Sequence, residues 1–115
     1  MQPDAAAFLW DARRAAELVQ QFCSGLTVDD YVADVLVRSA VERQLAIIGE
    51  ALNRLSTTDS ETAAEITDLA RIVSFRNILV HGYTSVDNYL VWQLVTTNLP
   101  VLLADVNHLL AERPE

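Results

Sequence analysis

Lysine is absent from this 115-residue sequence, so all eight basic residues are arginines. They stand against 16 acidic residues, which gives a formal net charge of −8 at pH 7. A chain with this charge repels polyphosphate at long range, and broad electrostatic binding to nucleic acid is therefore disfavoured. Any phosphate chemistry has to be local. Arginine offers a rigid donor fork for carboxylate or phosphate, although an all-arginine basic set also follows from genome composition.

Cysteine, glycine and proline are scarce. Cys23 is the only cysteine, which excludes an intrachain disulfide, and its place beside Phe22 on an apolar stripe predicts a core residue rather than a nucleophile. Three glycines and three prolines exclude a collagen-like or linker-rich chain. No uninterrupted apolar run approaches the roughly 18 residues of a membrane span, and residues 1–4 lack the basic start of a signal peptide. We therefore expect a soluble, cytoplasmic protein.

Apolar residues, by contrast, are abundant: they make up 51% of the chain, and the mean hydropathy is +0.19. The length predicts a single domain over residues 1–115, because a typical domain takes roughly 100 to 200 residues. A domain of this size buries only about two-thirds of the surface that its unfolded chain exposes. The apolar surplus therefore indicates that another subunit covers part of the surface.

Two segments in the first half of the chain have the apolar periodicity of helices. Residues 4–23 place apolar side chains at spacings of three and four, and Gly25 is the expected stop. Residues 29–55 repeat the pattern, and at 1.5 Å per residue such a helix spans about 40 Å, which is long for so small a domain. Gly49 inside this segment costs about 1 kcal/mol relative to alanine, which suggests close helix packing rather than ligand binding.

The second half predicts two further helices. Residues 61–81 follow a short polar break, with Ser60 as the expected cap. The fourth helix is expected to start from Ser85 as N-cap with Asp87 in its first turn, and Pro100 should kink it. Strand signals are weak everywhere. We therefore predict an all-α fold, an up-and-down bundle of four main helices.

Polar residues interrupt the apolar face of the third predicted helix. Its stripe repeats at spacings of three and four, and Arg76 occupies one of the slots that the pattern assigns to the interior. Asn77 interrupts a second apolar row on the same helix, which contains Ile66, Ala70 and Val73. Burying an unpaired charge costs several kcal/mol, so such residues are expected to have a partner or a function. One reading is an internal ion pair between Arg76 and a carboxylate of the second helix, such as Glu42 or Glu50.

A second reading is catalytic. Residues 76–83 offer a guanidinium, an amide, the imidazole of His81 and the phenol of Tyr83. Arginine can hold a phosphodiester through two hydrogen bonds, and histidine, with a reference pKa of about 6.5, can move a proton at neutral pH. Cleaving RNA through its own 2′-hydroxyl needs a base and an acid, and a single His81 fills only one role. A two-fold homodimer would supply both, with no metal or cofactor.

Three other side chains have simpler explanations. His108 lies late in the fourth predicted helix without polar neighbours and is expected to be incidental. Arg43 has two readings. Its side chain either reaches the site of the homodimer, or it extends along the surface to solvent or pairs with nearby acidic residues. Trp92 could stack on a base, but packing in the core or in the dimer is the expectation.

The string Arg76-Asn77-x-x-x-His81-x-Tyr83 resembles the signature of the HepT-like toxins of the HEPN superfamily. Residues 41–51, which end in Ile-Gly-Glu-Ala, resemble a second family segment, and the similarity covers most of the chain. The resemblance implies a HEPN-like helical homodimer in which two Arg76/His81 pairs face one cleft. It also implies a metal-independent endoribonuclease.

The resemblance further implies a toxin role and a partner. A minimal nucleotidyltransferase encoded beside the toxin would neutralise it by transferring AMP to Tyr83. Arg76 would stabilise the phosphate, His81 would act as acid or base, and Asn77 would orient the site. Family members often have Trp seven positions before the motif arginine, where this sequence has Leu69. The alternative is a non-catalytic helical module that serves as partner and substrate of the nucleotidyltransferase, which the acidic surface favours.

Overall fold

The computed structural model describes residues 1–81 and 86–112, except for the side chains of Val80 and His81. This part of the chain consists of helices and connecting turns, without strands. The main helices are α1 (Pro3–Cys23), α3 (Val35–Thr58), α5 (Leu69–His81) and α7 (Leu99–Ala111). Shorter elements connect them: α2 (Val28–Ala33), α4 (Ser60–Ala63), α6 (Asn88–Gln93) and the π-helical turn η1 (Leu94–Asn98). The predicted all-α bundle of four main helices is confirmed.

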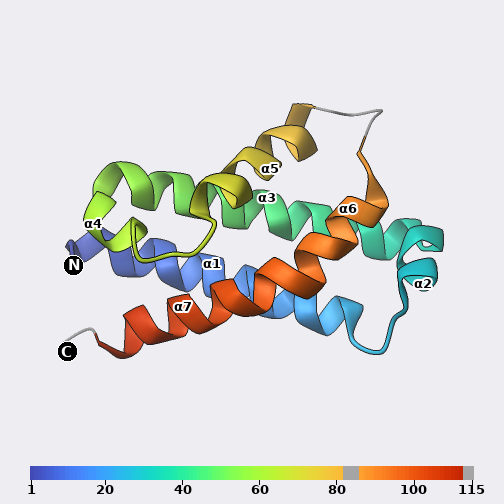
Figure 1. The fold of residues 1–115 in the computed structure, drawn as a ribbon, viewed down its shortest axis with the longest axis horizontal. Coiled ribbons are helices and arrows are strands. Elements are labelled where there is room, and N and C mark those ends of the chain that lie inside the picture. Colours follow the sequence, from blue (N-terminus) through green and yellow to red (C-terminus); the bar gives the residue numbers. More distant parts are fainter. Residues whose placement is uncertain (82–85, 113–115) are drawn as a thin grey trace.

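The bundle is built around α1 and α3, which lie side by side along the long axis of the molecule (Figure 1). α7 packs against α1, and α5 packs against α3. The molecule measures 44 × 28 × 19 Å. Every helix contributes side chains to its core, and the largest fully buried ones include Leu9, Tyr31, Ile48, Leu52, Leu55, Leu99 and Leu102.

α1 begins and ends as the sequence predicts. Pro3 stands in its first turn, where the missing backbone N–H would have no helical partner. Gly25 follows its last turn with a φ of 78°, in the left-handed region that favours glycine. Cys23 is buried, and burial raises the pKa of its thiol, which keeps the thiol neutral. The prediction of a core cysteine is confirmed.

The prediction of a single helix over residues 29–55 is wrong, because the chain forms two helices there, α2 and α3, which meet at Asp34. The backbone of Asp34 is extended, with φ −106° and ψ 98°, and its Oδ1 accepts a hydrogen bond of 3.1 Å from the backbone N–H of Val37. A short acidic side chain that caps the following helix competes with continuation of the preceding one. At the other end of α2, Thr27 and Asp30 form a capping box.

Two aromatic rings hold α2 against α6. Tyr31 is fully buried, and its ring centroid lies 5.3 Å from that of Trp92. Burial raises the pKa of Tyr31, so the phenol stays protonated at neutral pH. Trp92 is thus partly buried against the core of the subunit, as the expectation of core packing predicts.

The third predicted helix, over residues 61–81, is also divided. Its cap is Asp59 rather than Ser60: Asp59 Oδ1 accepts a 3.1 Å hydrogen bond from the backbone N–H of Thr62. Hydrogen bonds from the backbone N–H of Gln2 and from Thr62 lower the pKa of Asp59, because they favour the ionised carboxylate. The short helix that this cap starts, α4, ends at Ala63.

The turn between α4 and α5 is held by polar contacts that a periodic pattern does not reveal. Asp68 has a φ of 57°, in the left-handed region, which ends any continuous helix there. The backbone N–H of Thr67 donates to Asp105 Oδ2 at 2.9 Å, and this bond ties the turn to α7. α5 therefore begins anew at Leu69.

The fourth predicted helix begins after Asp87 rather than Ser85, which lies outside the described residues. Asp87 Oδ1 accepts two backbone N–H groups of the first turn at 3.0 and 3.2 Å. Close to Pro100, where the sequence predicts a kink, the helix contains the π-helical turn η1, which ends at Asn98. There the backbone N–H of Leu99 donates to the carbonyl five residues back. Pro100 lacks an N–H, so it could not have continued a regular ladder in any case.

One helical stretch, Asn88–Ala111, is long and apolar enough to cross a membrane by length and composition, with a mean hydropathy of 1.2. In the structure α7 packs against α1, and its apolar face is buried. The buried side chains on this face are Leu99, Leu102, Leu103, Val106 and Leu109. Packing in the bundle thus accounts for part of the apolar composition of the stretch, since 39% of its most apolar window is buried.

Candidate functional site

α5 presents Arg76 at the edge of its buried face. Ile72 and Phe75 are buried, the side chain of Arg76 is 30% exposed, and Asn77 is exposed. The expectation that Arg76 and Asn77 both face the interior is therefore wrong. The expected stripe ran through the turn at Asp68, whereas the helix restarts after it and its buried row is displaced by one position.

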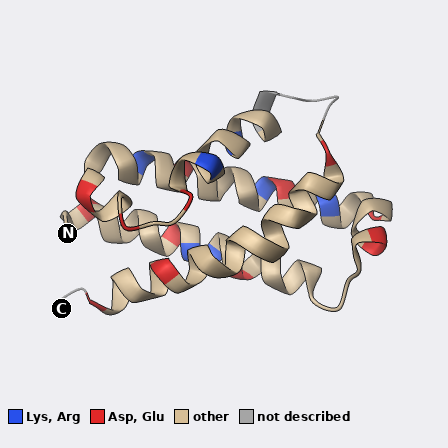
Figure 2. Cartoon of the chain, in the orientation of Figure 1, with Lys and Arg blue, Asp and Glu red and all other residues tan. Residues whose placement is uncertain are grey.

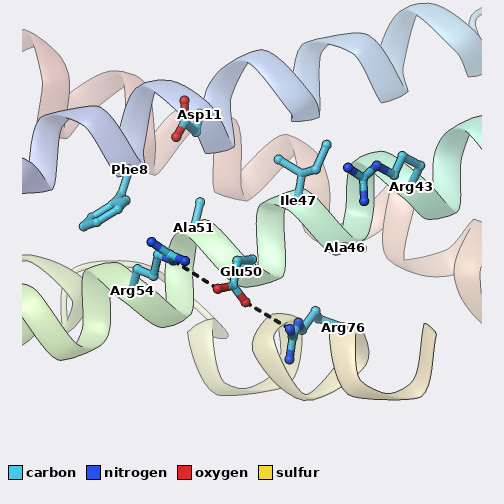
Figure 3. Close-up of a pocket in the computed structure, with 9 residues that line it drawn as sticks. All are labelled: Phe8, Asp11, Arg43, Ala46, Ile47, Glu50, Ala51, Arg54 and Arg76. Atoms are coloured by element: carbon cyan, nitrogen blue, oxygen red, sulfur yellow. Dashed lines mark hydrogen bonds and ion pairs between the residues drawn. The ribbon is translucent and has the colours of Figure 1, made fainter. Parts of the chain in front are cut away.

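Glu50 on α3 joins two arginines (Figure 3). Its Oε2 lies 3.0 Å from Arg76 Nη2, and its Oε1 lies 3.0 Å from Arg54 Nε. Glu50, one of the two partners suggested by the sequence, is thus the partner of Arg76. The pair is not internal, because the two side chains are 30% and 40% exposed. Such a pair contributes about 0–1 kcal/mol to stability, so its main effect is to fix the position of the guanidinium.

Asn77 provides a second contact for the same guanidinium. Arg76 Nη1 donates to Asn77 Oδ1 at 3.1 Å. An arginine side chain carries five N–H donors, and Glu50 and Asn77 together engage two of them. The remaining donors have no partner in the described part of the chain, and they are suited to an anion such as a phosphate.

Gly49 allows α5 to approach α3 at Arg76. A Cβ atom added at Gly49 would lie 2.8 Å from Arg76 Cγ and closer still to Arg76 Cβ. These are atoms of the rigid base of the side chain, so even alanine at this position would push Arg76 away. The predicted close packing at Gly49 is confirmed, and the residue that makes the approach is Arg76.

A groove of about 380 Å³ opens beside Glu50, between α1, α3 and α5. We call it the arginine groove, because Arg43, Arg54 and Arg76 line it. Figure 3 shows Arg43 and Arg54 on α3, on either side of Glu50. Arg43, whose role the sequence left open, thus reaches the same hollow as Arg76. The other lining residues are Asp11 and the apolar Phe8, Ala46, Ile47 and Ala51.

The net charge of −8 is unevenly distributed over the helices (Figure 2). α3 and α5 together contain five arginines and two glutamates, a balance of 5 − 2 = +3. Acidic residues gather at α2 and around α4, where residues 28–34 contain three and residues 59–68 contain four, without an arginine in either segment. The local field at the arginine groove is therefore more favourable to an anion than the charge of the whole chain suggests.

His81 is the last residue of α5, as the sequence predicts, and its backbone is described while its side chain is not. It lies five positions after Arg76, which corresponds to about 7.5 Å along the helix axis and about 140° around it. Gly82, the predicted helix stop, and Tyr83 lie outside the described residues. The structure thus brings Arg76 and Asn77 together, while the roles of His81 and Tyr83 stay predictions.

His108 and Arg54 differ from what the sequence suggested. His108 does have a polar neighbour, since its Nε2 lies 2.9 Å from Glu112 Oε1, one turn further along at the surface. Sequence reasoning missed Arg54. The signal was available, because Glu50 and Arg54 are four residues apart on one helix, a spacing typical of ion pairs. No group of three or more side chains suited to a metal ion converges in the described part of the chain.

The chain is similar to known proteins over most of its length. The family model described as Ribonuclease HepT-like matches residues 12–109. A Methanocaldococcus jannaschii protein named as a candidate RNase is 32% identical over 103 residues, which cover 90% of this chain and 94% of the relative. A Thermococcus cleftensis protein named as a probable ribonuclease HepT is 32% identical over 97 residues, which cover 83% of this chain and 86% of the relative. No solved structure matches.

Proposed function

The chain belongs to the ribonuclease HepT-like family, and from this premise we propose that it is the toxin of a toxin–antitoxin pair. In this proposal it is a metal-independent endoribonuclease of the cytoplasm, and its site consists of Arg76 and His81 at the interface of a homodimer. A minimal nucleotidyltransferase is its antitoxin.

The observation that carries the proposal is the way in which Arg76 is held. Gly49 admits its stem against α3, while Glu50 and Asn77 each take one donor of its guanidinium. Arg76 also lines the arginine groove. A fixed guanidinium with free donors is suited to a phosphodiester, and it stabilises the charge that develops on the phosphate during cleavage.

The reaction that fits this site is attack of an RNA 2′-hydroxyl on the adjacent phosphate. A base removes the 2′-proton, the 2′-oxygen bonds to phosphorus, and the bond to the 5′-oxygen breaks as an acid protonates that oxygen. Arg76 holds the phosphate oxygens, and Asn77 orients Arg76. Histidine is suited to both proton transfers near neutral pH, so the His81 residues of two subunits can share them.

An exposed apolar surface near the end of α5 supports a dimer there. Ile78 is 44% exposed and Leu90 on α6 is 40% exposed, and both line a shallow hollow with Phe75 and Leu94. Neighbouring Tyr89 is 59% exposed. Large exposed apolar side chains that cluster are typical of an interaction surface. A two-fold contact through this surface would place the two His81-bearing helix ends near each other.

RNA cleavage in the presence of a chelator tests the proposed activity. We expect the purified protein to cleave single-stranded RNA without divalent metal, and Arg76→Ala to lower the rate by about 10²–10³-fold, because one charge-stabilising donor group is lost. Arg14→Ala is the matched control, since Arg14 is exposed on α1 and lies outside the arginine groove. Cleavage that a chelator abolishes, or an Arg76→Ala variant as active as the native protein, would contradict the proposal.

The proposed regulation is tested by intact mass after co-expression with the nucleotidyltransferase. The Tyr83 phenol would lose its proton and attack the α-phosphate of ATP, forming the tyrosyl–AMP bond and releasing pyrophosphate. We expect the native chain to gain the mass of adenylyl groups, and Tyr83→Phe to gain none and to stay toxic beside the partner. Tyr89→Phe is the control, because Tyr89 is a second tyrosine close in sequence and is 59% exposed. Equal modification of native protein and Tyr83→Phe would exclude Tyr83 as the acceptor.

A further inference from the structure

Resting on the proposed ribonuclease function, we propose that the arginine groove binds the RNA backbone next to the cleaved phosphate, with Arg43 as the outer phosphate contact. Arg76 would hold the reacting phosphate, and Arg43 and Arg54 would hold phosphates of neighbouring nucleotides.

The arginines that α3 contributes lie on one line. Arg43 and Arg54 are eleven residues apart, which places them about 16 Å apart along the axis and within about 20° of the same face. Glu50 lies between them and connects this line to Arg76 on α5. A row of this length exceeds what one phosphate group can engage. It is suited to a chain of phosphates, as in single-stranded RNA, whose binding proteins use positively charged grooves that follow the backbone.

The donors of these side chains are available to a ligand. Arg43 is exposed. Among the side chains that the structure describes, it has no ion-pair or hydrogen-bond partner. Arg54 is 63% exposed and engages Glu50 through Nε, so both of its Nη groups are unengaged by that carboxylate. Arginine is the basic residue best suited to hold a phosphate through two parallel N–H bonds.

The charges that line the groove favour an anion. Three arginines face two carboxylates, a balance of 3 − 2 = +1 in a chain of net charge −8. Glu50 is already paired with Arg54 and Arg76, which leaves Asp11 on α1 as the other lining carboxylate. The rest of the lining is apolar and supplies no side-chain group that competes for hydrogen bonds. The groove is therefore a surface on which this acidic protein can hold a polyphosphate.

The salt dependence of RNA binding tests the groove directly. The probe is a short single-stranded RNA with 2′-O-methyl groups, which cannot be cleaved through its own 2′-oxygen. Each phosphate contact on a single strand contributes about 0.7 to the slope of log Kobs against log salt concentration. We expect Arg43→Gln to bind severalfold more weakly and to reduce the slope by about 0.7. Arg43→Lys keeps the charge and should keep the slope. Arg14→Gln changes the net charge equally outside the groove and should leave the slope unchanged.

The possible results separate this proposal from the ribonuclease proposal. Three results would contradict the proposal that the groove binds RNA: an unchanged slope for Arg43→Gln, an equal reduction of the slope for Arg14→Gln, or no binding of the probe by the native protein. Suppose that the native protein cleaves RNA, that Arg76→Ala does not, and that Arg43→Gln keeps the native slope. In that case only the proposal that the groove binds RNA fails. If the Arg43→Gln slope falls and the native protein never cleaves RNA, the ribonuclease proposal fails and the groove stands as an RNA-binding site.

Discussion

Replacing His81 with alanine is expected to lower the rate of RNA cleavage by about 10²–10⁴-fold, the usual contribution of a positioned acid or base. The expectation follows from the proposed reaction, in which one proton leaves the 2′-oxygen and another reaches the 5′-oxygen. The rate is measured on single-stranded RNA in the presence of a chelator. The matched control is His108→Ala, because His108 is 70% exposed and pairs with Glu112 on α7.

Mixtures of native protein and the His81→Ala variant test the dimeric site itself. If each cleavage needs one histidine from each of the two subunits, only dimers of two native chains are active. The activity of co-refolded mixtures then falls with the square of the native fraction. Sites that each use a single subunit would give a linear decline, which would contradict the shared cleft while leaving His81 in the reaction. An unchanged rate for pure His81→Ala would remove His81 from the mechanism.

Replacing Gly49 with alanine is expected to damage both the fold and the site. The new methyl group would overlap the Cβ and Cγ atoms of Arg76, so α5 has to move away from α3. Inserting a methyl group into such a close contact costs typically 1–3 kcal/mol in the free energy of unfolding. The guanidinium of Arg76 would move with its helix, and a displacement of about 1 Å at a catalytic group can cost about 10²-fold in rate.

Gly25→Ala separates loss of stability from loss of the site. Gly25 has a φ of 78°, and nothing lies within 4 Å of an added Cβ there. Alanine in this left-handed conformation costs about 1–2 kcal/mol, a loss comparable to that at Gly49, but it leaves Arg76 in place. We therefore expect both variants to melt earlier and only Gly49→Ala to cleave RNA slowly per folded molecule. A Gly49→Ala protein as stable and as active as the native one would contradict the close contact.

The helices were predictable where apolar periodicity alone forms them. The boundaries of α1 follow from its stripe, from Pro3 and from Gly25, and the structure confirms them. Three of the errors fall at aspartates whose side chains accept backbone N–H bonds and start a helix, Asp34, Asp59 and Asp87. A fourth falls at Asp68, whose φ of 57° ends the expected helix. A periodic pattern reads apolar side chains, so it does not show which of several neighbouring Asp, Ser or Thr residues makes the cap.

The candidate site was predictable in its residues and not in its geometry. The sequence by itself determined the helical class, the family and the motif around Arg76, because each depends on residue types and on spacing along the chain. Only the tertiary structure decided that Arg76 lies at the edge of the core, that Glu50 and not Glu42 holds it, and that Arg43 shares its groove. These facts depend on the angular phase of α5 after the turn at Asp68 and on how closely α5 approaches α3 at Gly49. Contacts between separate helices set both, and no spacing within one helix encodes them.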